Sequence, residues 1–216
     1  MIFLIDLDGT LLDSDHFHCE AWSKVLNQSP GHIEDIINTI GMEKYLERSN
    51  FQRLRKLKFE EMIKIEDINF IQNADKFIDF IDENNINHTV VTHTDKLIVD
   101  YFKYRVPKLK KLKNWVVRED YTHPKPDPEC YKLAMTKYGK GEKNVMGFEN
   151  SKHGLKALSH VTPNSIKINK KSNWRLIIEC IRETNMELME KEWIPINYYF
   201  LYEYSKNEAK ITNMQN

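Results

Sequence analysis

Two carboxylates spaced by one residue follow a short apolar run at the start of the chain. Residues 2–5 (Ile-Phe-Leu-Ile) lead directly into Asp6 and Asp8, and Gly9 opens a turn after them. At this spacing Asp6 can attack phosphorus and carry an aspartyl-phosphate, while Asp8 protonates the leaving oxygen and later deprotonates water. An isolated Asp-x-Asp is usually only a solvated acidic turn, so the interpretation depends on companion residues elsewhere.

Three later segments supply such companions. Thr92 closes an apolar run with a hydroxyl that can bond a phosphoryl oxygen, although a β-branched residue is also common in any strand. Lys125 lies between two prolines, which stiffen its loop and suit a fixed positive charge for phosphate. Glu149 and Asn150 end another apolar run in side-chain oxygens, which are the ligands that Mg²⁺ prefers.

The stretches between these segments have the periodicity of alternating strands and helices. Apolar spacing predicts strands at 1–5, 88–92, 115–117, 144–148 and 165–168, and helices at 75–84, 95–104, 128–138, 152–158 and 172–191. Such alternation indicates an α/β fold with a doubly wound parallel sheet of the Rossmann type. Ligands bind beyond the carboxyl ends of the strands in these sheets, so we expect the four polar segments in one crevice.

A helical segment interrupts this pattern after the first strand. Residues 15–67 carry apolar side chains at helical spacing, punctuated by Gly31 and Gly41. We therefore expect an α/β core made of residues 1–14 and 68–192, with an inserted helical domain at 15–67. Residues 193–216 form a C-terminal tail that is aromatic at first and then polar.

The composition narrows the class of partner. The 216 residues include 32 basic and 32 acidic side chains, so no net charge steers the protein toward nucleic acid or an anionic membrane. The apolar start is too short for a signal peptide, and no apolar run is long enough to span a bilayer. The three cysteines have no metal-ligand spacing and are read as reduced packing residues. We expect a cytoplasmic monomer or homodimer with no nucleic-acid or membrane partner.

The run from Asp6 to Ser14 (Asp-Leu-Asp-Gly-Thr-Leu-Leu-Asp-Ser) resembles the first signature motif of the haloacid dehalogenase (HAD) superfamily. Thr92, Lys125 and the pair Glu149-Asn150 follow in the order and approximate spacing of its second, third and fourth motifs. The sequences around Lys125 and Glu149 are similar to those of β-phosphoglucomutase-like and phosphoglycolate-phosphatase-like members. The resemblance covers nearly all of the chain before the tail. It implies a HAD-like core in which the helical insert is a C1 cap that closes over the substrate.

The resemblance also implies the roles of the catalytic residues. Asp6 is the nucleophile, Asp8 is the general acid and base, and Thr92 and Lys125 hold the phosphoryl group. A carboxylate acid/base at Asp8 argues against a haloacid dehalogenase proper and favours phosphate chemistry. The function implied is a magnesium-dependent phosphatase that hydrolyses a small phosphorylated metabolite, a phosphomonoester, through an aspartyl-phosphate.

One position of the implied magnesium site departs from the family pattern. The resemblance assigns Mg²⁺ to Asp6, the main-chain carbonyl of Asp8, Glu149 and Asn150. Relatives usually carry aspartate where this chain has Asn150. An amide oxygen can still ligate magnesium, but one negative charge is lost. We expect weaker magnesium binding or a changed role for this position.

Five residues are candidates for substrate contacts: Gly9, Thr10, His18, His93 and Lys44. His18 belongs to a His-x-x-Ala-Trp stretch that looks like the cap hinge of β-phosphoglucomutase-like members, although it is otherwise an ordinary surface residue. Lys44 could reach a distal anionic group, but relatives that hold a second phosphate tend to have arginine near here, and such lysines are mostly solvated. His93 follows the second motif, so its main-chain N–H would face phosphate.

Two other functions stay open at this point. A sugar phosphomutase would use the same nucleophile but pass the phosphoryl group to another hydroxyl of the substrate, and His18 with the cap resemblance favours it. A catalytically weak member would bind phosphate compounds or a protein partner without turnover. Asn150 and the aromatic tail are the features that favour this third function.

Overall fold

All five strands of this computed structural model run parallel in one sheet, in the order β3-β2-β1-β4-β5. The structure describes residues 1–188. The chain builds the sheet outward from β1 in both directions, which confirms the predicted doubly wound α/β fold. The strands are β1 (Ile2–Ile5), β2 (Asn87–Val91), β3 (Trp115–Val116), β4 (Val145–Glu149) and β5 (Ser165–Lys167).

The central strand β1 is buried on both faces. Phe3 and Ile5 belong to one apolar cluster, and Ile2 and Leu4 belong to another on the opposite face. Successive side chains of a strand point to opposite faces, so a strand covered on both sides needs an uninterrupted apolar run. This requirement explains why residues 2–5 contain no polar side chain.

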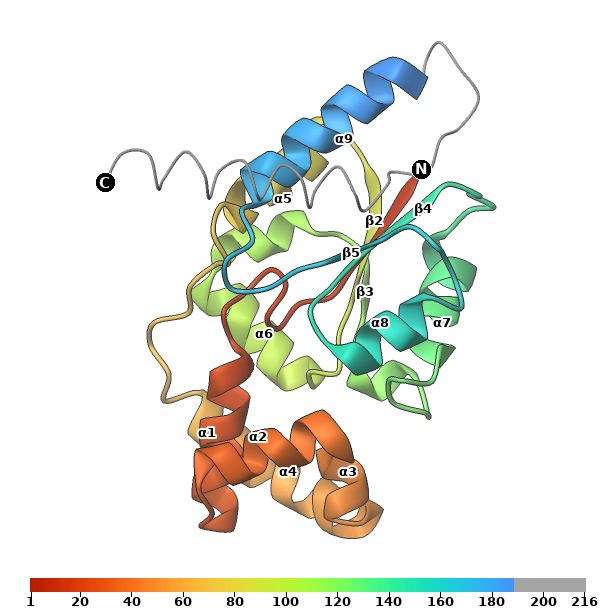
Figure 1. Cartoon of the computed structure of the whole chain (residues 1–216). Coiled ribbons are helices and arrows are strands. Elements are labelled where there is room, and N and C mark those ends of the chain that lie inside the picture. The colour runs from red at the N-terminus through yellow and green to blue at the C-terminus, as the bar shows by residue number, and fades with distance from the viewer. Residues whose placement is uncertain (189–216) are drawn as a thin grey trace, which may run out of the picture.

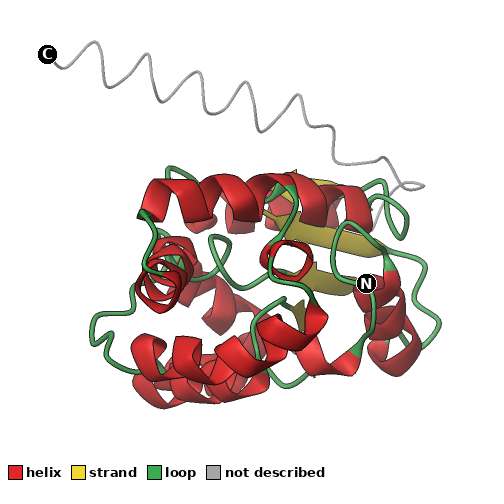
Figure 2. Ribbon diagram, turned by 90° about the horizontal axis from the view of Figure 1, so that it is seen from below, coloured by secondary structure: helices red, strands yellow, loops and turns green. Residues whose placement is uncertain are grey.

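Helices cover both faces of the sheet, as Figures 1 and 2 show. Side chains of α5, α6 and α9 contribute to the apolar cluster around Phe3, and those of α7 and α8 to the cluster around Leu4. Two short 3-10 helices, η1 and η2, lie in the connections on either side of β3. These helices are α5 (Ala74–Glu83), α6 (Lys96–Arg105), η1 (Pro107–Lys111), η2 (Arg118–Asp120), α7 (Glu129–Tyr138), α8 (Lys152–Leu158) and α9 (Trp174–Leu188).

The segment between β1 and α5 is helical and has its own apolar cluster. Trp22, Ile33, Ile36 and Met42 form the buried centre of this cluster. The helices pack together at one end of the molecule, at the bottom of Figure 1. They are α1 (Asp15–Leu26), α2 (Pro30–Thr39), α3 (Met42–Tyr45) and α4 (Arg48–Met62). The domain boundaries drawn from the sequence stay predictions.

The last helix shows where the sequence prediction was less accurate. Helix α9 begins at Trp174 and not at residue 172. The amide oxygen of Asn173 accepts the main-chain N–H of Arg175 at 3.0 Å, as a helix-capping residue does. The predicted end of this helix at 191 and the tail at 193–216 lie outside the described residues. Within residues 1–188, no helix is both long and apolar enough to cross a bilayer.

Candidate active site

The four polar segments leave the sheet at the carboxyl ends of its strands or in loops beside them. Asp6 follows β1, Thr92 follows β2, and Asn150 follows β4. Lys125 comes from the loop before α7, and Glu149 is the last residue of β4. Parallel strands share one carboxyl edge, and the distances below show that these side chains meet there.

A buried ammonium group joins these segments. Lys125 donates from Nζ to Asp6 Oδ1 at 2.7 Å, to Glu149 Oε1 at 2.6 Å and to the carbonyl of Val91 at 3.1 Å. Burial by itself would lower the pKa of Lys125, but the carboxylates of Asp6 and Glu149 outweigh burial and raise that pKa well above its usual value. Lys125 is therefore a permanent positive charge next to Asp6.

Glu149 serves mainly to hold this lysine. Its Oε1 also accepts the hydroxyl of Tyr131 at 3.0 Å, and its Oε2 accepts the main-chain N–H and the hydroxyl of Ser151 at 2.9 and 3.1 Å. The side chain is fully buried. Both oxygens are thus occupied by donors. In this arrangement Glu149 supports Lys125, and its predicted contact with magnesium stays a prediction.

Asp8 lies at the centre of a second network. Its Oδ1 accepts the hydroxyl of Ser14 at 2.6 Å and lies 2.9 Å from His18 Nε2; its Oδ2 accepts the hydroxyls of Thr94 at 2.6 Å and Thr92 at 3.2 Å. Burial would raise the pKa of Asp8, but His18 and these hydrogen bonds outweigh it and hold the pKa well below its usual range. Asp8 is ionised here, and the Thr92 hydroxyl is directed to it.

Gly9 lies where the loop after β1 contacts Asn150, the residue that follows β4. Its φ of +69° lies in the left-handed region that favours glycine, and a Cβ there would be 2.0 Å from Asn150 Nδ2 and 2.1 Å from Asp15 Oδ2. Asn150 donates from Nδ2 to Asp15 Oδ2 at 2.8 Å. Burial, followed by the charge of Asp8, raises the pKa of Asp15 to about 7. Asp15 was not among the residues predicted from the sequence.

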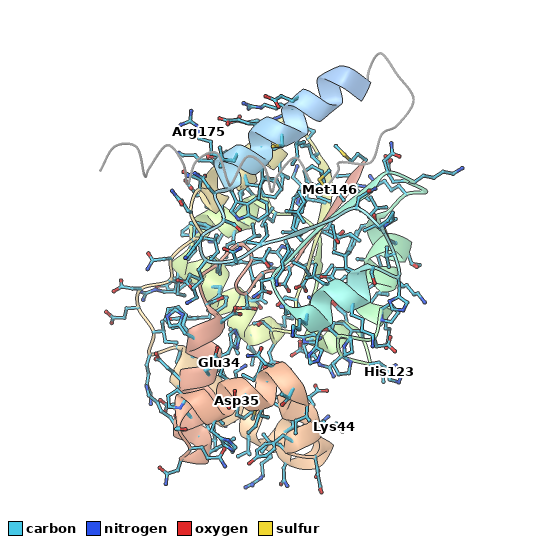
Figure 3. The ribbon with its side chains drawn as sticks, in the orientation of Figure 1. Glu34, Asp35, Lys44, His123, Met146 and Arg175 are labelled. Atoms are coloured by element: carbon cyan, nitrogen blue, oxygen red, sulfur yellow. The ribbon has the colours of Figure 1, made fainter. Side chains whose placement is uncertain are left out.

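The other residues predicted to contact substrate lie in different places in the structure. The hydroxyl of Thr10 donates to Asp6 Oδ2 at 3.1 Å, so Thr10 belongs to the site. His93 Nε2 accepts the main-chain N–H of Lys125 at 2.7 Å, so this imidazole nitrogen is unprotonated and supports the lysine loop. Lys44 is exposed on α3 at the outer end of the helical insert, as Figure 3 shows. None of its contacts joins it to the other predicted site residues.

A different lysine of the insert is buried near Asp8. Lys58 on α4 is only 7% exposed, and its Nζ lies 5.4 Å from the centroid of the Trp22 ring. No residue in the described part of the chain forms a hydrogen bond or ion pair with its ammonium group. Burial lowers the pKa of Lys58, and the charges of Asp95 and Asp8 only partly offset this. An ammonium group that has lost most of its water and has no ion-pair partner favours an anion beside it.

The donors around Asp6 fit a magnesium ion. Among the described residues, no group donates a hydrogen bond to the main-chain carbonyl of Asp8 or to Asn150 Oδ1, which leaves both oxygens free to accept a cation. All are oxygens, as Mg²⁺ prefers. Burial and then the charge of Glu149 raise the pKa of Asp6, and a divalent cation beside this carboxylate would favour its ionised form.

A second group of possible metal ligands lies at the surface. His123, Asp127 and Glu129 hold ligand atoms within 4.8 Å of one another, and Figure 3 labels His123 at the edge of the core. Glu129 accepts the main-chain N–H groups of Thr122 and His123 at 2.9 and 2.7 Å. These hydrogen bonds give Glu129 a structural role that needs no metal.

Comparison with known proteins decides the family. A model of the haloacid dehalogenase-like hydrolases matches residues 2–166. The chain belongs to this family. No curated protein matches the sequence closely. The fold of this chain is similar to that of CbbY from Rhodobacter sphaeroides in complex with phosphate. The TM-score is 0.69 and the identity is 17%, over 78% of this chain and 85% of CbbY. A hydrolase from Pseudomonas syringae has a TM-score of 0.67 and 22% identity, covering 77% of this chain and 83% of its own.

Several residues in the site of this HAD-family hydrolase were not predicted from the sequence. Thr94 and Ser14 both bind Asp8, and each had a usable signal: Thr94 repeats the hydroxyl of Thr92 two residues later, and Ser14 closes the first motif. Tyr131 had no signal, because a tyrosine on an amphipathic helix is usually packing. Its hydroxyl position follows only from how α7 packs on the sheet.

The close packing around Glu149 can be tested through Gly154 on α8. A Cβ at Gly154 would lie 1.7 Å from Glu149 Oε1, so Gly154→Ala must displace the carboxylate that holds Lys125. We expect a loss of about 1–3 kcal/mol of unfolding free energy in urea titrations. Gly31→Ala on α2 is the matched control, because nothing lies within 4 Å of its added Cβ. Equal stability of the two variants would contradict the packing described here.

Proposed function

We propose that this HAD-family hydrolase is a magnesium-dependent phosphatase that cleaves a small phosphorylated metabolite. The observation that carries the proposal is the buried contact of 2.7 Å between Lys125 Nζ and Asp6 Oδ1, with the hydrogen-bonded Asp8 close by. A positive charge beside a carboxylate nucleophile suits attack on a negatively charged phosphoryl group. The phosphate bound to CbbY, a protein of the same fold, is in keeping with this reaction.

The reaction proceeds in two displacements at phosphorus. A carboxylate oxygen of Asp6 forms a bond to phosphorus as the bond to the ester oxygen breaks, and the departing oxygen takes a proton from Asp8. Water then attacks the aspartyl-phosphate and gives a proton to Asp8. The bond between Asp6 and phosphorus breaks, so inorganic phosphate leaves and the Asp6 carboxylate is restored.

The other residues of the site bind and orient. Lys125 offers its charge to the phosphoryl oxygens, and the hydroxyl of Thr10 holds the Asp6 carboxylate in place through a hydrogen bond of 3.1 Å. Asp6, the carbonyl of Asp8 and Asn150 would hold Mg²⁺. When bound, this ion neutralises charge on the phosphoryl group and on the nucleophile.

Asp8 needs a proton before it can act as an acid. Because the structure holds Asp8 ionised, the proton has to arrive with substrate or from a protonated neighbour. His18 Nε2 lies 2.9 Å from Asp8 Oδ1 and is the group positioned to deliver it. His18 is on α1, so this step couples the acid to the helical insert, which we propose acts as the cap. A cytoplasmic location and a monomeric or homodimeric state stay predictions.

The nucleophile is tested by Asp6→Asn. The amide keeps the shape of the side chain but cannot attack phosphorus, so we expect turnover to fall by roughly 10⁴-fold or more, with the circular dichroism spectrum unchanged. The measurement is phosphate release from a panel of phosphorylated metabolites, with and without magnesium. Asp100→Asn, an exposed change on α6 where Asp100 pairs with Lys96, is the control. A fully active Asp6→Asn protein would rule out the mechanism.

The acid is tested by Asp8→Asn with two kinds of ester. Sugar phosphates have poor leaving groups and need the proton, so their kcat should fall by about 10²–10⁴-fold. Aryl phosphates with activated leaving groups need less help and should lose less. The ratio of the two kcat values separates this role from general damage to the site, because damage would lower both rates equally.

A sugar phosphomutase is the second candidate, and Lys58 favours it. A mutase has to hold a sugar bisphosphate, and Lys58, a largely buried lysine without an ion-pair partner among the described residues, offers a positive charge for the second phosphate. Lys44, which the sequence suggested for this role, is exposed. A mutant of CbbY has been crystallised with xylulose-(1,5)bisphosphate, so a protein of this fold can hold such a ligand.

Lys58→Met tests this assignment, because methionine keeps the length of the side chain and removes its charge. We expect kcat/KM for bisphosphates to fall by about tenfold or more, the size of a lost charge-assisted hydrogen bond, while simple monophosphates change little. Lys44→Met is the matched control on the same insert. Equal losses for both substrate classes would show that Lys58 has no part in recognising a second anion.

A further inference from the structure

The amide of Asn150 has a fixed orientation. Its contact of 2.8 Å is with Asp15 Oδ2, and a divalent cation nearby favours the ionised form of Asp15, which can only accept hydrogen bonds. The NH₂ group must therefore face Asp15, and Oδ1 must point to the other side. Among the described residues, no donor reaches this Oδ1. Asp15 thus determines which atom of Asn150 is available to a cation.

The pair lies directly on the catalytic loop. Both Asn150 Nδ2 and Asp15 Oδ2 lie within about 2 Å of the place that a Cβ of Gly9 would occupy, at 2.0 and 2.1 Å. Gly9 follows Asp8, whose main-chain carbonyl is also free of donors in the described part of the chain. The pair of side chains therefore packs directly against the residue that follows Asp8.

The carboxylate of Asp15 is poorly satisfied. The side chain is half-buried, and its only hydrogen bond within the described chain is the one from Asn150. No lysine, arginine or histidine forms an ion pair with it there; Lys170, the nearest positive influence, binds Asp13 at 3.0 Å. The hydrogen bond from Asn150 is therefore the interaction that holds this carboxylate in the described part of the chain.

We propose that Asp15 and Asn150 act as one unit toward the divalent cation of the proposed function. Asn150 gives its amide oxygen to the ion, and Asp15, a positioning residue, orients that amide and supplies the negative charge that an aspartate at position 150 would carry. The negative charge that is missing at Asn150 is therefore supplied by Asp15, the first residue of α1. A hydrogen-bonded carboxylate behind a metal ligand typically changes metal affinity by about 10–100-fold.

The pairing has a consequence for substitutions at position 150. Asn150→Asp would place two carboxylates in contact with no hydrogen between them, because the donor NH₂ is gone. Like charges at this distance repel strongly in a partly buried site. The extra charge should therefore not tighten magnesium binding, although a simple count of charges says that it should.

The test measures metal binding without turnover. Mn²⁺ binding to the full chain is followed by electron paramagnetic resonance of the free ion, with magnesium competing, in the absence of substrate. Asp15→Asn should weaken binding by about 10–100-fold. The exchanged variant, Asp15→Asn with Asn150→Asp, keeps one charge and one hydrogen bond with the partners reversed. It should bind within about threefold of the original protein, as expected for two directly coupled residues.

Several outcomes would overturn the pairing. They are unchanged binding in Asp15→Asn, tighter binding in Asn150→Asp alone, or an exchanged variant as weak as Asp15→Asn. Asp100→Asn is the control for the loss of a distant acidic group. Thermal unfolding in EDTA shows whether each variant folds. If Asp15→Asn does not fold, the metal affinity of the exchanged variant tests the pairing by itself.

The inference rests on the proposed function but can fail separately from it. Metal binding that depends on Asp15, without turnover of any phosphate ester, would rule out the phosphatase function and support the Asp15–Asn150 pairing. Turnover that persists in EDTA, with no metal bound by the original protein, would rule out both the Asp15–Asn150 pair as a metal-binding unit and the magnesium dependence, and would leave a phosphatase that needs no metal.

Discussion

The ammonium group of Lys125, buried between Asp6 and Glu149, is the interaction on which the site depends. Two carboxylates at adjacent strand ends would repel each other in a buried setting, and removing the partner of a buried charge typically costs about 3–5 kcal/mol. Lys125 removes that penalty and also bonds the carbonyl of Val91, so one side chain connects the ends of β1, β2 and β4. Glu149 is needed to keep the lysine in place, which leaves Asp6 as its reactive neighbour.

Much of this arrangement could be predicted because it follows from the sheet. The uninterrupted apolar residues 2–5 require a strand covered on both faces, and parallel strands put the residues that follow them at one edge. Asp6, Thr92 and the end of β4 were therefore expected to meet. Periodicity also located the helices, to within a few residues at their ends. These are properties of the backbone, and local sequence determines them.

The partners of individual side chains could not be predicted in the same way. Asp15 and Asn150 are 135 residues apart, and nothing in either local sequence indicates that their side chains touch. Glu149 and Asn150 look equivalent in the sequence, but a strand turns successive side chains to opposite faces. Glu149 consequently faces Lys125 and Tyr131, while Asn150 faces Gly9 and α1. Such distinctions depend on how helices pack on the sheet, which the pattern of apolar residues does not specify.

The helical insert contributes charge as well as shape to the chemistry. Glu43 on α3 accepts two hydrogen bonds of 2.7 Å from the guanidinium of Arg118 in the core, and Arg55 on α4 forms ion pairs with Asp95 and Glu119. These pairs are partly exposed, so each contributes little stability and water can replace it. His18, by contrast, contacts Asp8 directly, and the charge of Asp8 acts on Lys58. Movement of the insert would therefore change the environment of Asp8, and with it the affinity of this carboxylate for the proton that the leaving group needs.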